Sequence, residues 1–325
     1  MGVRHALGAI KADSVRTLKV IDKSQAALDS ARVQLQSSGA KKDIKFDTVL
    51  DLDEQYDVII LSTTAETRNR LVNDLLRCPP RFLLIEKPIG QSVNEAEKLC
   101  AMLSRNPNTI TSVNLNTRLQ ECVKRLKCDL LSLDQFRGPK HINVTAGAIG
   151  IGSNGVHLID KCFYLLDADS AVVKTAEIYD DVILSGRGEK FIDFGGWADV
   201  RFTRNGDFVG KLSIQIIPTS SYGWNFEVVG ANGYMSLDTI SGKYTKNLRR
   251  ADSQLPVYRY AADYDKLEIE TFQPENLDLL TTKWLNGLSN GEDLLPNLEY
   301  GMKVHGVMFD WLSYMPKDKI KYPIT

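Results

Sequence analysis

Short apolar segments alternate with amphipathic segments of helical length through the first third of this chain. Strands are predicted over 17–21, 57–61, 82–85 and 109–113, and helices over 26–35, 69–76 and 96–103. Strands separated by helices of this length form a parallel sheet with helices on both faces. The pattern therefore predicts an α/β, doubly wound domain over residues 1–116, in which ligands bind at the carboxyl ends of the strands.

Residues 117–325 follow a different pattern, with longer strands that are joined by turns. Strands are predicted over 140–146, 172–179, 197–203, 208–217, 225–229 and 234–237, and closing helices over 277–288 and 298–314. The turns 204–207 and 230–233 contain Asn-Gly, which is typical of tight antiparallel connections. This half is predicted to be an α+β domain with a large, mostly antiparallel sheet.

Composition restricts the classes of function. The 325 residues are 43% hydrophobic and carry a formal net charge of -1, with no long basic run. Nucleic acid and anionic membranes both attract clustered Lys and Arg, so neither is expected as the main partner. We find no apolar run of membrane-spanning length and no signal peptide at the polar N-terminus, so a cytoplasmic location is expected. The five cysteines form no C-x-x-C pair and the four histidines are far apart, so no metal site is expected.

Polar residues stand just past several predicted strand ends. Asp22, Thr63 with Thr64, and Glu86-Lys87-Pro88 each follow an apolar segment. Because the carboxyl ends of parallel strands meet at one edge of a sheet, we expect these groups to converge there. Asp22 alone is equally well explained as a strand-end or helix-capping residue, and a Lys-Pro after a strand is usually only a turn.

A second polar cluster lies on a predicted helix, in the segment 152–160, which reads Gly-Ser-Asn-Gly-Val-His-Leu-Ile-Asp. Removing hydride from a secondary alcohol requires a base for the hydroxyl proton and a positive charge that stabilises the alkoxide. A neutral His157 and Lys87 suit these roles. Asp160 lies three residues after His157 on the same helical face, where it orients the imidazole, binds substrate or is a surface carboxylate. A lone His on such a helix is more often a core residue, so the order of all these elements carries the interpretation.

The Glu86-Lys87-Pro88 element followed by the segment 152–160 resembles the paired signatures of the Gfo/Idh/MocA oxidoreductases, and the resemblance covers almost the whole chain. It implies a Rossmann-like N-terminal domain, NAD or NADP as the hydride carrier, and a sugar, cyclitol or nucleotide-sugar substrate. Cofactor binding is implied for Gly2, Val3, Asp22, Thr63, Thr64, Glu86, Lys87 and Pro88. Substrate binding is implied for Lys87, Asn116, Arg118, Ser153, Asn154 and His157. The family's sheet commonly mediates homo-oligomers, so a dimer or tetramer is expected.

The first residues resemble the end of the family's glycine fingerprint, with Gly2 as its third glycine. The first strand and two preceding glycines do not appear in the sequence. Asp22 lies about 20 residues further on, the usual place for the carboxylate that binds the adenosine ribose and disfavours a 2′-phosphate. NAD is therefore expected in preference to NADP. We also expect the coding region upstream of Met1 to encode an apolar strand ending in G-x-G, and dinucleotide binding to be weak without it.

Several positions depart from the commonest family pattern. Ser153 stands where an Asp usually shares the work of the histidine, and it cannot supply a charge. This form resembles a branch found among surface-polysaccharide and nucleotide-sugar genes, where Asn154 takes a substrate-binding role. Arg68 stands where relatives often carry a His, and Thr63-Thr64 lacks the usual Pro.

Arg118, within an Asn-x-Arg element, either contacts substrate or caps a strand end. Two other kinds of function are also considered for the whole chain. One is a catalytically inert relative that binds a sugar or cofactor as a sensor or assembly protein, and the other is a structural oligomer subunit. Retention of both Lys87 and His157 favours the enzyme.

Overall fold

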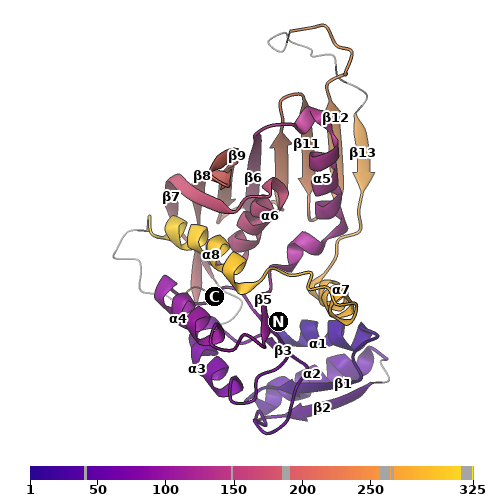
Figure 1. The fold of residues 1–325 in the computed structure, drawn as a ribbon, viewed down its shortest axis with the longest axis vertical. Helices are drawn as coiled ribbons and strands as arrows, with labels where there is room; N and C mark the ends of the chain where they lie inside the picture. The colour runs from indigo at the N-terminus through magenta and orange to yellow at the C-terminus, as the bar shows by residue number, and fades with distance from the viewer. Residues whose placement is uncertain are drawn as a thin grey trace. The chain divides into compact units, whose positions relative to one another are not determined.

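The computed structural model describes residues 1–39, 42–147, 149–184, 191–256, 264, 267–315 and 324. The chain forms two compact units, which are described separately below with the labels of Figure 1. The first unit comprises residues 1–119 and 275–302, and the second comprises residues 120–274 and 303–325.

The first unit is an α/β unit with parallel strands, as the sequence predicts. Its strands are β1 (Thr17–Ile21), β2 (Asp43–Asp47), β3 (Val58–Leu61), β4 (Phe82–Ile85) and β5 (Ile110–Val113). Its helices include α1 (Gly2–Lys11), α2 (Gln25–Ser37), α3 (Ala65–Leu75) and α4 (Val93–Leu103). Ser24 and Ser92 start α2 and α4 by accepting hydrogen bonds from the N–H groups of Ala27 and Glu95. The strand β2 is an addition to the predicted set.

The parallel strands form two groups, β1-β2 and β3-β4-β5. In the described residues no pairing joins β1 to β3. Helix α1 nevertheless packs against both, because Leu18 of β1 and Val58 and Ile60 of β3 contact the cluster that contains Ala9 and Ala12. A doubly wound sheet places its first strand between its second and its fourth. In such a sheet the first strand would lie between β1 and β3, where the two groups of strands are separate. The upstream strand expected from the sequence stays a prediction.

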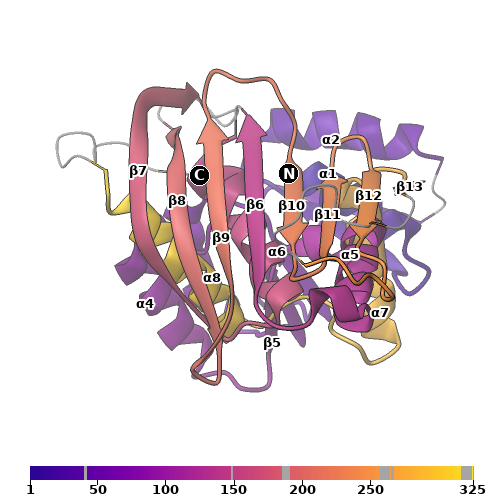
Figure 2. The same cartoon turned by 90° about the horizontal axis from the view of Figure 1, so that it is seen from above.

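The second unit contains an eight-stranded sheet in the order β13-β12-β11-β10-β6-β9-β8-β7, and Figure 2 shows these strands side by side. The strands are β6 (Lys140–Gly147), β7 (Ser170–Leu184), β8 (Ile192–Arg204), β9 (Asp207–Ile217), β10 (Asn225–Val229), β11 (Gly233–Asp238), β12 (Lys243–Leu248) and β13 (Glu268–Thr271). Only β6 and β9 among these neighbours pair in parallel, so the predicted mostly antiparallel sheet is confirmed. The β8–β9 turn has φ of 51° at Asn205 and 86° at Gly206, the left-handed conformations that Asn and Gly adopt most readily.

Two helices, α5 (Glu121–Ser132) and α6 (Val156–Leu166), pack on this sheet and on each other. Alternate residues of β9, namely Leu212, Ile214 and Ile216, are buried, as are Ile142 and Val144 of β6. This period of two is the pattern of a sheet with one covered face. Helix α8 (Leu298–Leu312) contributes residues to both units.

Helix α7 (Leu277–Ser289) belongs to the first unit although it lies late in the chain. A Cβ on Gly8 would lie 2.3 Å from the Asp278 carbonyl oxygen, so α1 and α7 approach closely because Gly8 has no side chain. The Thr282 hydroxyl also donates to the Gly8 carbonyl at 2.8 Å. The predicted division into 1–116 and 117–325 differs from the observed units in this respect, since a single boundary cannot represent a segment that returns to the first unit.

None of the helices in the described part of the chain combines the length and the apolar character needed to cross a membrane.

Candidate functional site

The loop after β4 carries Glu86, Lys87 and Pro88, which are all buried. The Glu86 Oε1 atom lies 2.8 Å from His5 Nε2 and accepts a hydrogen bond from Asn114 Nδ2 at 2.8 Å. The other oxygen, Oε2, accepts the Lys87 backbone N–H at 3.2 Å. His5 Nδ1 lies 2.9 Å from the Thr281 hydroxyl. One carboxylate thus links the first turn of α1, the ends of β4 and β5, and, through His5, helix α7.

Electrostatics keep this carboxylate ionised. Burial by itself raises the pKa of Glu86, but the hydrogen bond and charge of His5, the charge of Lys87 and the Asn114 amide outweigh burial and hold the pKa well below its usual range. Lys87 is 6% exposed. The loop therefore presents a lysine whose backbone is fixed by a buried anion.

The predicted cofactor residues of this unit lie where parallel strands end. Thr63 and Thr64 follow β3, and Glu86, Lys87 and Pro88 follow the adjacent β4. Gly2 and Val3 form the start of α1, where a Cβ on Gly2 would lie 2.9 Å from Ser62 Oγ. The helix N-terminus is therefore next to the carboxyl end of β3, an arrangement that suits an anionic ligand.

Asp22 follows β1, and it takes part in a local turn. Its Oδ1 atom accepts the Ser24 N–H at 2.9 Å, and its own N–H donates to the Asp47 carbonyl at 3.2 Å. Through its Oδ1 atom, Asp22 therefore acts as a turn-forming residue, as one interpretation of the sequence predicts. Its role toward a ribose stays a prediction.

Among the buried polar atoms of the first unit that have no hydrogen-bond partner within the described residues are Thr63 Oγ1, Asn116 Nδ2 and Thr117 Oγ1. Buried polar atoms normally find partners, so each such atom needs an explanation, of which a bound ligand is one. Thr63 follows β3, and Asn116 begins the short helix η1 (Asn116–Leu119) after β5. Arg118, on the same short helix, lies over the Tyr300 ring at 4.5 Å from its centroid.

In the second unit, the helical turn η3 (Ile151–Gly155) leads directly into α6. Asp193 of β8 fixes this turn, since its carboxylate accepts the N–H groups of Gly152 at 3.0 Å and Ser153 at 2.7 Å. The Gly150 N–H also donates to Ser153 Oγ at 3.1 Å. Ser153 is therefore part of the turn itself, and Asn154 follows it on the same turn.

Helix α6 carries His157 and Asp160, which are 5% and 0% exposed. One turn beyond His157 lies Lys161, whose ammonium nitrogen is 5.2 Å from the Trp224 ring centroid and 5.1 Å from that of Phe226. Burial lowers the pKa of Lys161 to about 8. The base predicted from the sequence thus lies on a helix whose charged residues are all buried.

Sequence reasoning missed the network residues His5, Asn114, Thr281, Asp193 and Lys161, and it treated Arg68 only as a departure from the family. For Asp193 and Arg68 the sequence contains a signal, since each is a charged residue in an apolar pattern. Asp193 interrupts the apolar run Phe191-Ile192-Asp193-Phe194, and Arg68 precedes the buried Val72 by four residues on α3. A charged residue at an apolar position of a pattern is a candidate for a structural or functional role.

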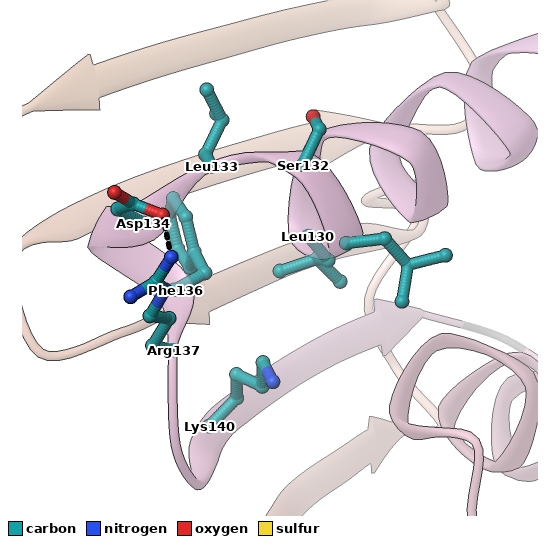
Figure 3. Close-up of a pocket in the computed structure, with 8 residues that line it drawn as sticks. Leu130, Ser132, Leu133, Asp134, Phe136, Arg137 and Lys140 are labelled. Atoms are coloured by element: carbon teal, nitrogen blue, oxygen red, sulfur yellow. Dashed lines mark ion pairs between the residues drawn. The ribbon is translucent and has the colours of Figure 1, made fainter.

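A hollow of about 300 Å³ in the second unit is lined by Leu130 to Asp134, Phe136, Arg137 and Lys140 (Figure 3). Its Asp134–Arg137 ion pair is 2.8 Å long and exposed. None of the predicted site residues lines this hollow, so it does not mark the predicted site. Among the described residues no group of three His, Cys, Asp or Glu side chains could hold a metal ion.

Neither a family model nor a curated protein sequence matches this chain. Solved structures do match it over nearly its whole length. Levoglucosan dehydrogenase, in complex with NADH and levoglucosan, has a TM-score of 0.71 at 14% identity and covers 97% of this chain and 94% of its own. UDP-N-acetylglucosamine 3-dehydrogenase from Acidithiobacillus ferrooxidans has a TM-score of 0.63 at 15% identity, with coverage of 92% and 97%. The transcriptional regulator Gal80p from Kluyveromyces lactis has a TM-score of 0.67 at 14% identity, with coverage of 94% and 84%. At these identities the likeness shows a shared fold.

Proposed function

We propose that this protein is an NAD-dependent oxidoreductase that transfers hydride between nicotinamide and a secondary hydroxyl or keto group of a sugar, cyclitol or nucleotide sugar. The observation that carries the proposal is the Glu86-Lys87-Pro88 loop, in which a buried carboxylate fixes the backbone of a lysine at the carboxyl end of a parallel strand. Two proteins of the same fold support the substrate class, one bound to NADH and levoglucosan and the other acting on UDP-N-acetylglucosamine.

The residues of the first unit suit a dinucleotide. The start of α1 at Gly2 and Val3 would hold the pyrophosphate, and the second carboxylate oxygen of Asp22 would accept a ribose hydroxyl. Thr63 Oγ1, which is buried without a partner in the described residues, would hydrogen-bond the cofactor with Thr64 beside it. Glu86, Lys87 and Pro88 would bound the nicotinamide end. The cofactor, when bound, supplies the hydride acceptor or donor.

The protein's own groups would handle the proton and the charge. His157 would remove the proton from the substrate hydroxyl, Lys87 would stabilise the alkoxide oxygen, and Asp160 would orient the imidazole. Asn116, with its partnerless Nδ2 atom in the described residues, would bind substrate together with Arg118, Ser153 and Asn154. A surface-polysaccharide or nucleotide-sugar role, a homo-oligomeric state and a cytoplasmic location belong to the same proposal.

A second candidate function is a catalytically inert sugar- or cofactor-binding regulator. Two observations favour it. Ser153 is engaged with Gly150 inside the turn and carries no charge, and a transcriptional regulator shares the fold. Such a protein would bind the ligands of the enzyme without turning them over.

A thermal-shift screen against NAD, NADP, free sugars and nucleotide sugars, followed by a turnover assay of every ligand that binds, tests both functions. If the protein is the proposed enzyme, NAD should raise Tm more than NADP does, and at least one sugar should reduce NAD. Replacement of Asp22 by Ala should reduce the preference for NAD, because the carboxylate would repel the 2′-phosphate of NADP. Binding without turnover would favour the regulator, and failure to bind any dinucleotide would overturn the proposed enzyme.

A further inference from the structure

Arg68 is a wholly buried guanidinium that spans two loops of the first unit. It lies on α3 and is 0% exposed. Its Nη2 atom donates to the Thr63 carbonyl at 2.7 Å, and its Nη1 atom donates to the Ile89 carbonyl at 3.1 Å and to the Pro88 carbonyl. Thr63 follows β3 and Pro88 and Ile89 follow β4, so one side chain joins the two loops in which cofactor and catalytic residues are predicted.

Placing a charge inside a protein is costly unless hydrogen bonds compensate for lost hydration. Here backbone carbonyls provide that compensation, and hydrogen bonds from a charged donor are stronger than those from a neutral one. Two of these three carbonyls, those of Pro88 and Ile89, belong to the residues that directly follow Lys87, and both residues are buried. The position of the Lys87 backbone is therefore constrained from one side by Glu86 and from the other by Arg68.

We propose that Arg68 is a positioning residue, which fixes the backbone next to Lys87 by hydrogen-bonding the Pro88 and Ile89 carbonyls of one loop and the Thr63 carbonyl of the other. This set of hydrogen bonds is called the tether below. Its catalytic consequence rests on the proposed function, whereas the tether itself does not. The planar fork of arginine reaches both loops at once. A lysine at this position is a point charge that reaches one of them, and a methionine fills the volume without donating to either.

The activity test compares Arg68→Met, Arg68→Lys and Val72→Ala. Val72 is also 0% exposed on α3, so its truncation destabilises the same helix without removing the tether. We expect Arg68→Met to lower kcat about 10²-fold, the scale of a misplaced catalytic group, and Arg68→Lys to recover about tenfold of that loss. Val72→Ala should lower Tm and keep kcat. Two results would overturn the positioning role of Arg68. One is an equal loss of kcat in Arg68→Met and Val72→Ala when the two variants have similar Tm values, and the other is an unchanged kcat in Arg68→Met.

A second measurement needs no turnover. Amine acylation followed by mass spectrometry compares the labelling rate of Lys87 with that of the exposed Lys211 in the same sample. The tether predicts that Lys87 labelling rises several-fold in Arg68→Met and stays unchanged in Val72→Ala. An unchanged Lys87 rate in Arg68→Met contradicts the tether even if the protein is an active dehydrogenase. A raised Lys87 rate in a protein without any dehydrogenase activity would support the tether while overturning the proposed function.

Discussion

His5 Nε2 lies 2.8 Å from Glu86 Oε1, and the two side chains are 3% and 0% exposed. This contact connects the first turn of α1 to the residue that precedes Lys87. The position of α1 is therefore linked to the Glu86-Lys87-Pro88 loop through this buried contact.

Replacing Glu86 by Gln should lower the free energy of unfolding by about 3 kcal/mol near pH 7, the usual scale for removing one charged member of a buried hydrogen-bonded network. The pKa of Glu86 is held below its ordinary value of 4.5, so the stability that this carboxylate contributes is present above that pH and is lost as the pH falls further. Urea unfolding over a pH series should thus show that acidification lowers the free energy of unfolding less in the variant than in the wild type. Glu97→Gln, an exposed position on α4, is the control and should change neither quantity. A wild-type pH profile in Glu86→Gln would show that the pair does not stabilise the fold.

Lys87→Ala and His157→Ala should each reduce kcat by about 10² or more while the protein stays folded, since these are the usual effects of losing an oxyanion partner or a general base. Ser153→Ala should cost much less. The double variant should lose less than the product of the single losses, because the proposed function has both groups act on one transition state. Steady-state kinetics with circular dichroism as the folding control make the measurement. If His157→Ala kept full activity, the base would have to be another group, with Asp160 next.

Gly150→Ala should destabilise the second unit by about 2 kcal/mol, the scale of an overpacked site. The backbone of Gly150 has φ of -86°, which any residue can adopt, so only space is limiting. An added Cβ would lie 1.9 Å from the Asp193 carboxyl group and would displace it from the turn before α6. The matched control is Gly306→Ala on α8, where nothing lies within 4 Å, and it should be neutral or stabilising. Equal Tm values for the two variants would contradict the role of Asp193.

Lys161→Met should raise the free energy of unfolding near pH 7 by up to about 3 kcal/mol, corresponding to a pKa difference of 10.5 - 8 = 2.5. Burial lowers the pKa of Lys161 from 10.5 to about 8. Between these values the unfolded chain holds a proton that the folded chain has lost, so wild-type stability should rise with pH there. The difference between Lys161→Met and wild type should shrink across this window, whereas Lys174→Met, at an exposed site, should show no such trend. A constant difference would mean that Lys161 keeps an ordinary pKa.

The local sequence is sufficient to predict an element wherever the interactions that stabilise the element are local. The alternation of buried residues in β9 and the Asn205-Gly206 turn follow from side-chain period and from backbone conformations that few residues adopt. The loop at Glu86-Lys87-Pro88 was found because it directly follows an apolar strand. The segment Asp43–Asp47 was missed as a strand, since its flanking aspartates and its half-buried residues give it little apolar signal, and pairing with β1 decides its state.

Side-chain patterns along the chain are enough to predict the two kinds of sheet, the turns and the positions of Lys87 after a strand and His157 on a helix. Long-range packing, which no local pattern reveals, brings α7 to α1 and His5 and Asn114 to Glu86. It also lets Arg68 span two loops and Asp193 fix the turn before α6. The reason is physical. A buried charge is stable only where distant segments bring it a partner, and no spacing along the chain specifies which partner burial will select.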